Sequence, residues 1–311
     1  MKLTITVILC LAVLYLVFIL APSILFYKII FSKSRYKNAD FEKLNEKNAY
    51  YAKYADRFSR AANFIYTLNK RNFEYTVSDG TLIRGAIYGD GGDKTAIFLH
   101  GYNTAPLNNF CLQAKLLYEQ GFNIAFIYSR AHGGSGGTSA MGIKEQGDLA
   151  ELVPYIKEQT AARQLLVYGM SMGCMTLAFA CDKLDANAVK GIVLDCGFNS
   201  PYAQLKQEMI RRHLPVFLII PLLTFFTRKF LKIDIKTSAT PALAACKVPA
   251  LFFHGEADAT VPCAFGKENY LACGAEKYWY SVPGAEHTLC FPAGGEEAEQ
   301  ELLKFIKKYF K

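Results

Sequence analysis

Short apolar runs that alternate with longer helical segments most constrain how this chain can fold. Six runs carry no charge and have the length of strands: Ala96–Leu99, Ile124–Tyr128, Leu165–Tyr168, Ile192–Leu194, Ala250–Phe253 and Tyr278–Val282. Parallel strands that are buried on both faces have this composition. The expected helices are Asn108–Glu119, Ile143–Glu158, Met172–Leu184, Lys267–Cys273 and Glu296–Tyr309. The alternation predicts an α/β fold with one doubly wound, mostly parallel sheet.

Two further runs precede this pattern. Phe73–Val77 and Leu82–Tyr88 are rich in strand-forming residues and are separated by a turn that contains Asp79-Gly80. This arrangement is typical of a β-hairpin. The main domain is therefore expected to span residues 72–311 and to begin with antiparallel strands.

An insertion interrupts the alternation between Leu194 and Ala250. Some fifty residues separate these two strands, more than a simple crossover needs, and we expect an inserted helical lid at about residues 198–246. The apolar stretch Leu214–Phe226 is too short to span a membrane. Its flanks are basic, through Arg211, Arg212, Arg228, Lys229 and Lys232. Two interpretations stay open: a helix pair that touches a membrane interface or shields an acyl pocket, and a hydrophobic lid packed on the core.

The N-terminal segment is apolar enough to form a membrane anchor. Leu3–Tyr27 contains no charged residue and is long enough to cross about 30 Å of hydrocarbon. We expect a transmembrane anchor at 1–30 and a helical connector at 31–71. A cleaved signal peptide is the alternative, although no small-residue cleavage site follows the apolar region. One lysine precedes the span and several basic residues follow it, which favours a single-pass protein of the cell membrane with a cytoplasmic catalytic domain.

Composition excludes several classes of function. The formal charge of +8 comes from dispersed Lys and Arg, so no nucleic-acid partner is expected and anionic lipid is favoured. The nine cysteines show no C-x-x-C pair and no zinc-ligand spacing, which indicates reduced core thiols and no metal. The glycine-rich stretch Gly133–Gly137 lacks the lysine and the spacing of nucleotide-binding loops, so no cofactor is expected. The oligomeric state cannot be read from the sequence.

The sequence Gly169-Met170-Ser171-Met172-Gly173 is a G-x-S-x-G motif. A predicted strand runs into it and a predicted helix begins at Met172, which is the strand-to-helix turn that this motif requires. We expect Ser171 to adopt a strained conformation and to serve as the nucleophile. The start of the helix would also stabilise negative charge that develops there.

A serine nucleophile needs a base and an acid. Of five histidines, His287 follows the last predicted strand and fits the chain order Ser, acid, His. Asp258, which follows the preceding strand, is the expected acid; Asp195 and then Glu256 are the alternatives. The expected oxyanion hole consists of the backbone N–H groups of Met172 and Tyr102.

Five segments together resemble the α/β-hydrolase superfamily: His100-Gly101, Arg130–Ser135, Gly169–Gly173, Phe253–Asp258 and Gly284–His287. The resemblance covers roughly residues 73–311 and is closest to bacterial membrane-anchored serine hydrolases similar to the serine-aminopeptidase-like group. It implies a triad of Ser171, Asp258 and His287 and an eight-stranded sheet. Ser129 departs from the pattern, because related sequences commonly have Asp before the arginine.

We therefore expect a serine hydrolase that cleaves carboxylic esters through an acyl-enzyme on Ser171. The apolar lid favours a medium or lipid-like acyl group, and a small-molecule or lipid-like ester is the expected substrate. A peptidase, amidase or thioesterase that uses the same triad remains an alternative. A non-catalytic, membrane-tethered binding protein is the alternative from another class.

Overall fold

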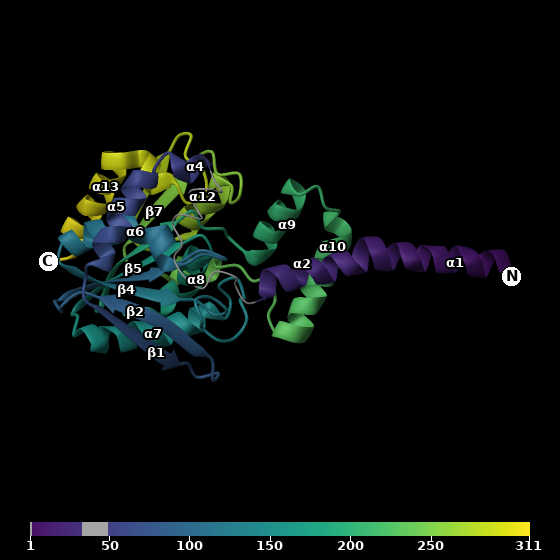
Figure 1. Cartoon of the computed structure of the whole chain (residues 1–311), viewed down its shortest axis with the longest axis horizontal. Helices are drawn as coiled ribbons and strands as arrows, with labels where there is room; N and C mark the ends of the chain where they lie inside the picture. Colours follow the sequence, from purple (N-terminus) through teal and green to yellow (C-terminus); the bar gives the residue numbers. More distant parts are fainter. Residues whose placement is uncertain (1, 33–48) are drawn as a thin grey trace.

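The computed structural model describes residues 2–32 and 49–311, and its centre is an eight-stranded sheet in the order β1-β2-β4-β3-β5-β6-β7-β8 (Figure 1). The strands are β1 (Lys70–Thr76), β2 (Leu82–Tyr88), β3 (Lys94–Leu99), β4 (Phe122–Tyr128), β5 (Gln164–Met170), β6 (Val189–Asp195), β7 (Ala250–Gly255) and β8 (Lys277–Val282). Strand β2 is antiparallel to both of its neighbours, and every other pair is parallel. The expected α/β class with a mostly parallel sheet is confirmed.

Helices cover both faces of the sheet, because the central strands are apolar on both. In β3, Ile97 and Leu99 contribute to one hydrophobic core, while Ala96 and Phe98 contribute to the other. The first core is closed by α7 (Glu145–Thr160), α8 (Met172–Ala180), α11 (Thr240–Ala245) and α12 (Cys263–Ala272). The second is closed by α5 (Ala55–Tyr66), α6 (Pro106–Glu119) and α13 (Cys290–Tyr309). The sheet is therefore buried on both faces and forms the scaffold of the molecule.

The connection from β6 to β7 contains the inserted helices. They are α9 (Pro201–Arg211), α10 (Val216–Phe226) and the short π-helical segment η3 (Thr227–Leu231), followed by α11. Helix α9 begins at Pro201, and the Ser200 hydroxyl accepts a hydrogen bond from the Ala203 N–H at 3.2 Å. We refer to residues 201–231 as the lid helices. They lie beside the second half of the N-terminal helix, on the side of the molecule from which that helix projects (Figure 1).

The N-terminal helix runs through α1 (Lys2–Tyr15), η1 (Leu16–Leu20) and α2 (Ala21–Phe31). Among the residues that the structure describes, it is the one helix long and apolar enough to cross a membrane. Figure 1 shows α1 projecting away from the sheet, while α2 lies against the lid helices. Of the expected connector, residues 33–48 lie outside the described residues, and α4 (Ala49–Ala52) and α5 follow them. The connector assignment stays a prediction.

Candidate active site

Ser171 lies at a sharp turn between β5 and α8. Its backbone has φ 53° and ψ −113°, in a region that residues with a side chain rarely adopt. A Cβ on Gly169 would lie 2.4 Å from the Gly173 carbonyl oxygen, and a Cβ on Gly173 would lie 1.9 Å from that of Leu99. Both glycines of the motif are therefore required by close backbone contact. The turn places the Ser171 hydroxyl at the carboxyl edge of the sheet, where parallel strands place their sites.

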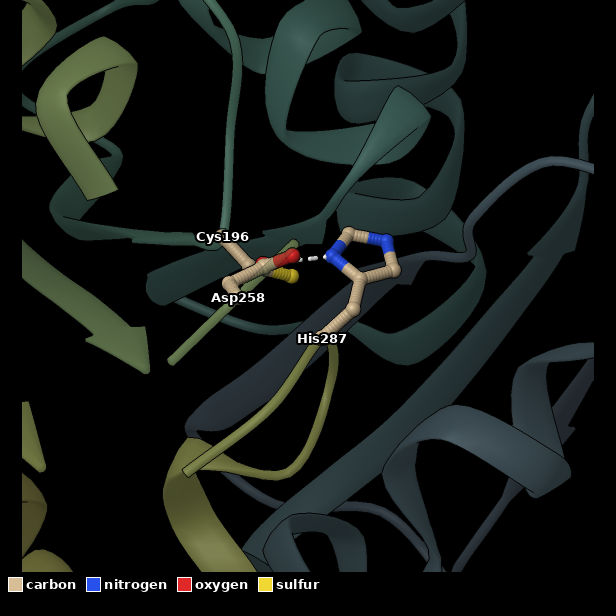
Figure 2. Close-up of side chains that lie close together, drawn as sticks. All are labelled: Cys196, Asp258 and His287. Atoms are coloured by element: carbon tan, nitrogen blue, oxygen red, sulfur yellow. Dashed lines mark hydrogen bonds and ion pairs between the residues drawn. The ribbon is translucent and has the colours of Figure 1, made fainter. Parts of the chain in front are cut away.

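His287 reaches this hydroxyl from the loop after β8. Its Nε2 lies 3.0 Å from Ser171 Oγ, and its Nδ1 lies 2.7 Å from Asp258 Oδ2. Figure 2 shows the imidazole of His287 and the carboxylate of Asp258 facing one another. The structure thus brings the three side chains expected from the sequence into one chain of hydrogen bonds.

Asp258 is held rigidly in the loop after β7. Its Oδ1 accepts hydrogen bonds from the backbone N–H groups of Thr260 at 2.9 Å and Val261 at 2.8 Å. The side chain is fully buried. Because the backbone bonds hold Oδ1, Oδ2 faces His287. A Cβ on Gly255 would lie 2.3 Å from the Ala285 carbonyl oxygen, which shows how closely the two loops approach. This arrangement fixes the orientation of the carboxylate.

The two alternative acids have other partners. Asp195 ends β6, and its Oδ2 accepts a hydrogen bond from the Tyr168 hydroxyl at 3.0 Å. Burial raises the pKa of Asp195 to about 7, which favours the neutral acid near neutral pH. Glu256 accepts a hydrogen bond from Ser281 Oγ at 2.8 Å on an exposed surface. The hydrogen-bond geometry at His287 therefore favours Asp258.

Two buried histidines organise the loop that follows β3. The Asn103 N–H donates to His132 Nε2 at 2.9 Å, and the Ser129 N–H donates to His100 Nε2 at 3.1 Å. Burial lowers the pKa of both imidazoles, that of His100 to about 3, so both remain neutral acceptors. The sequence did not predict these two hydrogen bonds. The only signal for them was that each histidine precedes a glycine at the end of a strand or within a loop.

The same loop lies beside Ser171. A Cβ on Gly101 would be 3.4 Å from Ser171 Cβ, so the backbone after β3 is in contact with the turn after β5. Met172 is buried as the first residue of α8, and Tyr102 follows Gly101. The Tyr102 hydroxyl donates to the Ile29 carbonyl at 2.5 Å and thus bonds to α2. The oxyanion hole from Met172 and Tyr102 stays a prediction.

A cavity of about 480 Å³ lies over Ser171 and His287. This volume is within the range of small-molecule sites. Its walls include Phe198, which precedes the lid helices, and Leu205 of α9. Ile29 and Ile30 at the end of α2 also line it. The contribution of α2 was not anticipated, because residues more than 140 positions from Ser171 carry no local signal of it.

One cluster offers ligand atoms of the kinds that metals prefer. Cys196 Sγ, an Asp258 oxygen and a His287 nitrogen all lie within 4.8 Å of one another (Figure 2). Burial and the nearby carboxylates raise the pKa of the Cys196 thiol well above its usual value, and a protonated thiol is a poor ligand. His287 and Asp258 are already hydrogen-bonded to one another. The cluster therefore fits a hydrogen-bonded triad better than a metal site.

Comparisons with known proteins agree with this geometry. A family model described as the alpha/beta hydrolase fold matches residues 95–218. The protein YqkD of Bacillus subtilis (strain 168) is 25% identical over 219 residues, which cover 68% of this chain and 71% of YqkD. The protein YfhR of Escherichia coli (strain K12) is 23% identical over 241 residues, which cover 75% of this chain and 79% of YfhR.

Solved esterase structures share the fold. The esterase Pf2001 of Pyrococcus furiosus has a TM-score of 0.65 at 22% identity, and the similarity covers 79% of this chain and 93% of that one. A thermophilic esterase of Thermogutta terrifontis has a TM-score of 0.54 at 18% identity, covering 78% and 100%. The serine-aminopeptidase-like subgroup stays a prediction. The sheet order, the turn at Ser171 and the family match together show that this chain has the α/β-hydrolase fold.

Proposed function

We propose that this protein is a serine hydrolase that cleaves carboxylic esters through an acyl-enzyme on Ser171. The observation that carries the proposal is the continuous chain from Ser171 Oγ through His287 to Asp258. His287 Nε2 is placed to take the hydroxyl proton, while Asp258 holds the proton on Nδ1 and stabilises the imidazolium that forms. Such an arrangement converts a weak hydroxyl nucleophile into a reactive one.

The reaction proceeds in two halves. Ser171 Oγ attacks the carbonyl carbon, and the tetrahedral oxyanion accepts hydrogen bonds from the backbone N–H groups of Met172 and Tyr102. The imidazolium of His287 then donates its proton to the departing alkoxide, which leaves an acyl group on Ser171. Water, deprotonated by His287, attacks this acyl group and releases the carboxylic acid. Asp258 stays ionised throughout both halves.

An ester substrate is favoured over other acyl compounds by the character of the cavity. Its walls are more apolar than polar, which suits a medium or lipid-like acyl group. The esterases named above use the same fold, which supports a hydrolase without identifying its leaving group. Peptides, amides and thioesters are the competing substrates, and a non-catalytic binding protein is the competing function.

We also propose that the helix Lys2–Phe31 is retained as a single-pass anchor in the cell membrane. Its second half is part of the folded domain: Phe26 and Phe31 are buried, and Ile29 accepts the hydrogen bond from Tyr102. Removal of this segment by a signal peptidase would expose these contacts. The basic residues that follow the span favour a cytoplasmic catalytic domain.

The test uses the full chain in detergent with p-nitrophenyl esters from acetate to palmitate. Hydrolysis that disappears in Ser171→Ala, together with labelling of Ser171 by a fluorophosphonate, is the expected result. Labelling without ester turnover, but with release from a p-nitroanilide or an acyl thioester, would replace the ester substrate with that class. A folded chain that is neither labelled nor active would leave the binding protein as the function.

A further inference from the structure

The lid helices contact the N-terminal helix where its exposed segment ends. Residues 2–10 and 12–18 of the N-terminal helix are exposed, while Ser23, Phe26 and Phe31 are buried against the folded part. The segment from residue 2 to residue 20 is about 28 Å long at 1.5 Å per residue. That length matches the hydrocarbon core of a bilayer, about 30 Å. A bilayer around the exposed segment would therefore end where α10 contacts α2 and η1.

Helix α10 exposes an apolar stripe at this level. Ile219, Ile220 and Leu223 face the core, whereas Phe217, Pro221 and Phe225 recur at every fourth position and are exposed. The Phe217 side chain is 77% exposed. Water-exposed apolar side chains in such a row are costly for a soluble surface, and they suit the boundary between headgroups and acyl chains.

The charge around this stripe points to the kind of surface that covers it. Residues 201–236 contain seven Lys and Arg but only two Asp and Glu. Lys229 Nζ lies 5.5 Å from the ring centroids of both Phe225 and Phe230, so a cation stands beside exposed aromatic rings. Basic residues next to membrane-inserted aromatics are attracted to anionic lipid.

The cavity over Ser171 extends to the end of the N-terminal helix and to α9 of the lid helices. Its lining includes Ile29 and Ile30 of α2 and the last turn of α9, where Arg211 and Arg212 both form ion pairs with Glu208. Glu286 also lines the cavity, so two arginines and two glutamates balance in its lining. The cavity itself does not select a charged ligand, and the preference for anionic lipid belongs to the outer surface of the lid helices.

We propose that the cavity opens onto an anionic lipid bilayer and that the substrate is an ester of a membrane lipid, whose acyl chain reaches Ser171 between α2 and the lid helices. The proposal rests on the proposed function for its chemistry. The anchor then has two roles: it holds the protein at the bilayer and it forms one wall of the acyl site. The bonds formed and broken are those of the ester hydrolysis already described, with water as the second substrate.

The first test locates the lid helices relative to the bilayer. The chain has a single tryptophan, Trp279, so Phe217→Trp in a Trp279→Phe background places the only indole on the stripe. The full chain is placed in nanodiscs that contain anionic lipid brominated near the headgroup end of the acyl chains. We expect strong quenching of this indole. Leu271→Trp in the same background is the matched control, because Leu271 is 67% exposed on α12, outside the lid helices. Equal quenching at the two positions, or none at Phe217→Trp, would overturn the membrane surface.

The second test measures the reaction in the same nanodiscs. We expect release of fatty acid from the nanodisc lipid that depends on Ser171, and a several-fold fall in the ratio of lipid to p-nitrophenyl acetate turnover in Phe217→Glu but not in Leu271→Glu. Turnover of the soluble ester without release of fatty acid would refute the membrane substrate and leave the esterase standing. Loss of both reactions and of fluorophosphonate labelling would refute the proposed function, while quenching still reports on the surface.

Discussion

Replacement of Asp258 by Asn tests the triad most sharply, because the loop dictates how the new amide must lie. Oδ1 accepts hydrogen bonds from two backbone N–H groups, those of Thr260 and Val261. The amide oxygen of Asn must take this position, since a flipped amide would leave two buried donors unsatisfied at about 1–3 kcal/mol each. The NH₂ group then points at His287 Nδ1, where Asp258 Oδ2 now lies.

The consequence is a change of tautomer. An NH₂ donor opposite Nδ1 requires that nitrogen to be unprotonated, which places the imidazole proton on Nε2. Nε2 then donates to Ser171 Oγ and can no longer accept its proton, so the general base is lost. The same substitution in the type case of the serine hydrolase triad lowers kcat by about 10⁴-fold, and at 1.36 kcal/mol per tenfold this is about 5 kcal/mol of transition-state stabilisation.

The assay is kcat/KM for p-nitrophenyl butyrate by the full chain in detergent, with thermal unfolding as the check on folding. Asp195→Asn is the matched control: it changes a buried carboxyl at the end of the neighbouring strand but keeps an acceptor for Tyr168, and activity within a few-fold of the parent is expected. If Asp258→Asn retains activity within tenfold while Asp195→Asn is inactive, the assignment of the acid is wrong.

Three further predictions follow from the packing and the buried groups. Gly173→Ala places a Cβ 1.9 Å from a backbone oxygen of β3 and should lower Tm by roughly 5–10 °C. Gly147→Ala is the control, because its Cβ meets no atom within 4 Å and Tm should not change. Equal Tm values for the two variants would show that the turn can relax. His132→Ala removes the acceptor of the Asn103 N–H and should lower kcat about tenfold with little change in KM. His132→Gln should restore part of the lost kcat. A loss of Tm without a loss of kcat would mean that His132 has a structural role alone. Between about pH 4 and pH 7, Asp195 is protonated in the folded state and ionised in the unfolded one, so the folded state binds more protons and stability falls as pH rises through this window. Asp195→Asn should flatten that fall in thermal unfolding measured at pH 5 and pH 8, and an unchanged slope would contradict the raised pKa.

The architecture of the sheet was predictable because it is encoded locally. Each central strand is an apolar run and each crossover has a helical period, so the fold class and most element positions follow from short windows of sequence. Some boundaries moved by a few residues: α12 begins at Cys263 rather than Lys267. In α13 a short helical stretch from Cys290 precedes the expected helix Glu296–Tyr309, and a kink at Gly295 separates the two. These shifts occur where a proline or a glycine sets the local backbone.

The turn at Ser171 was also determined locally. A strand, two glycines at fixed spacing and the start of a helix predict a strained turn at the serine, and the structure shows its positive φ. The order of Ser171, Asp258 and His287 along the chain, each after a predicted strand, was enough to select them as candidates. Parallel strands bring their carboxyl ends to one edge of the sheet, so residues that follow them can meet.

Only the tertiary structure shows that Asp258, and not Asp195, lies beside His287, and only it shows what surrounds Ser171. Both aspartates follow neighbouring strands, and only the loop conformations turn one toward His287 and the other toward Tyr168. The wall formed by Ile29 at the end of α2 depends on contacts between segments far apart in the chain. Such contacts arise from the packing of whole elements, and no short stretch of sequence carries a signal for them.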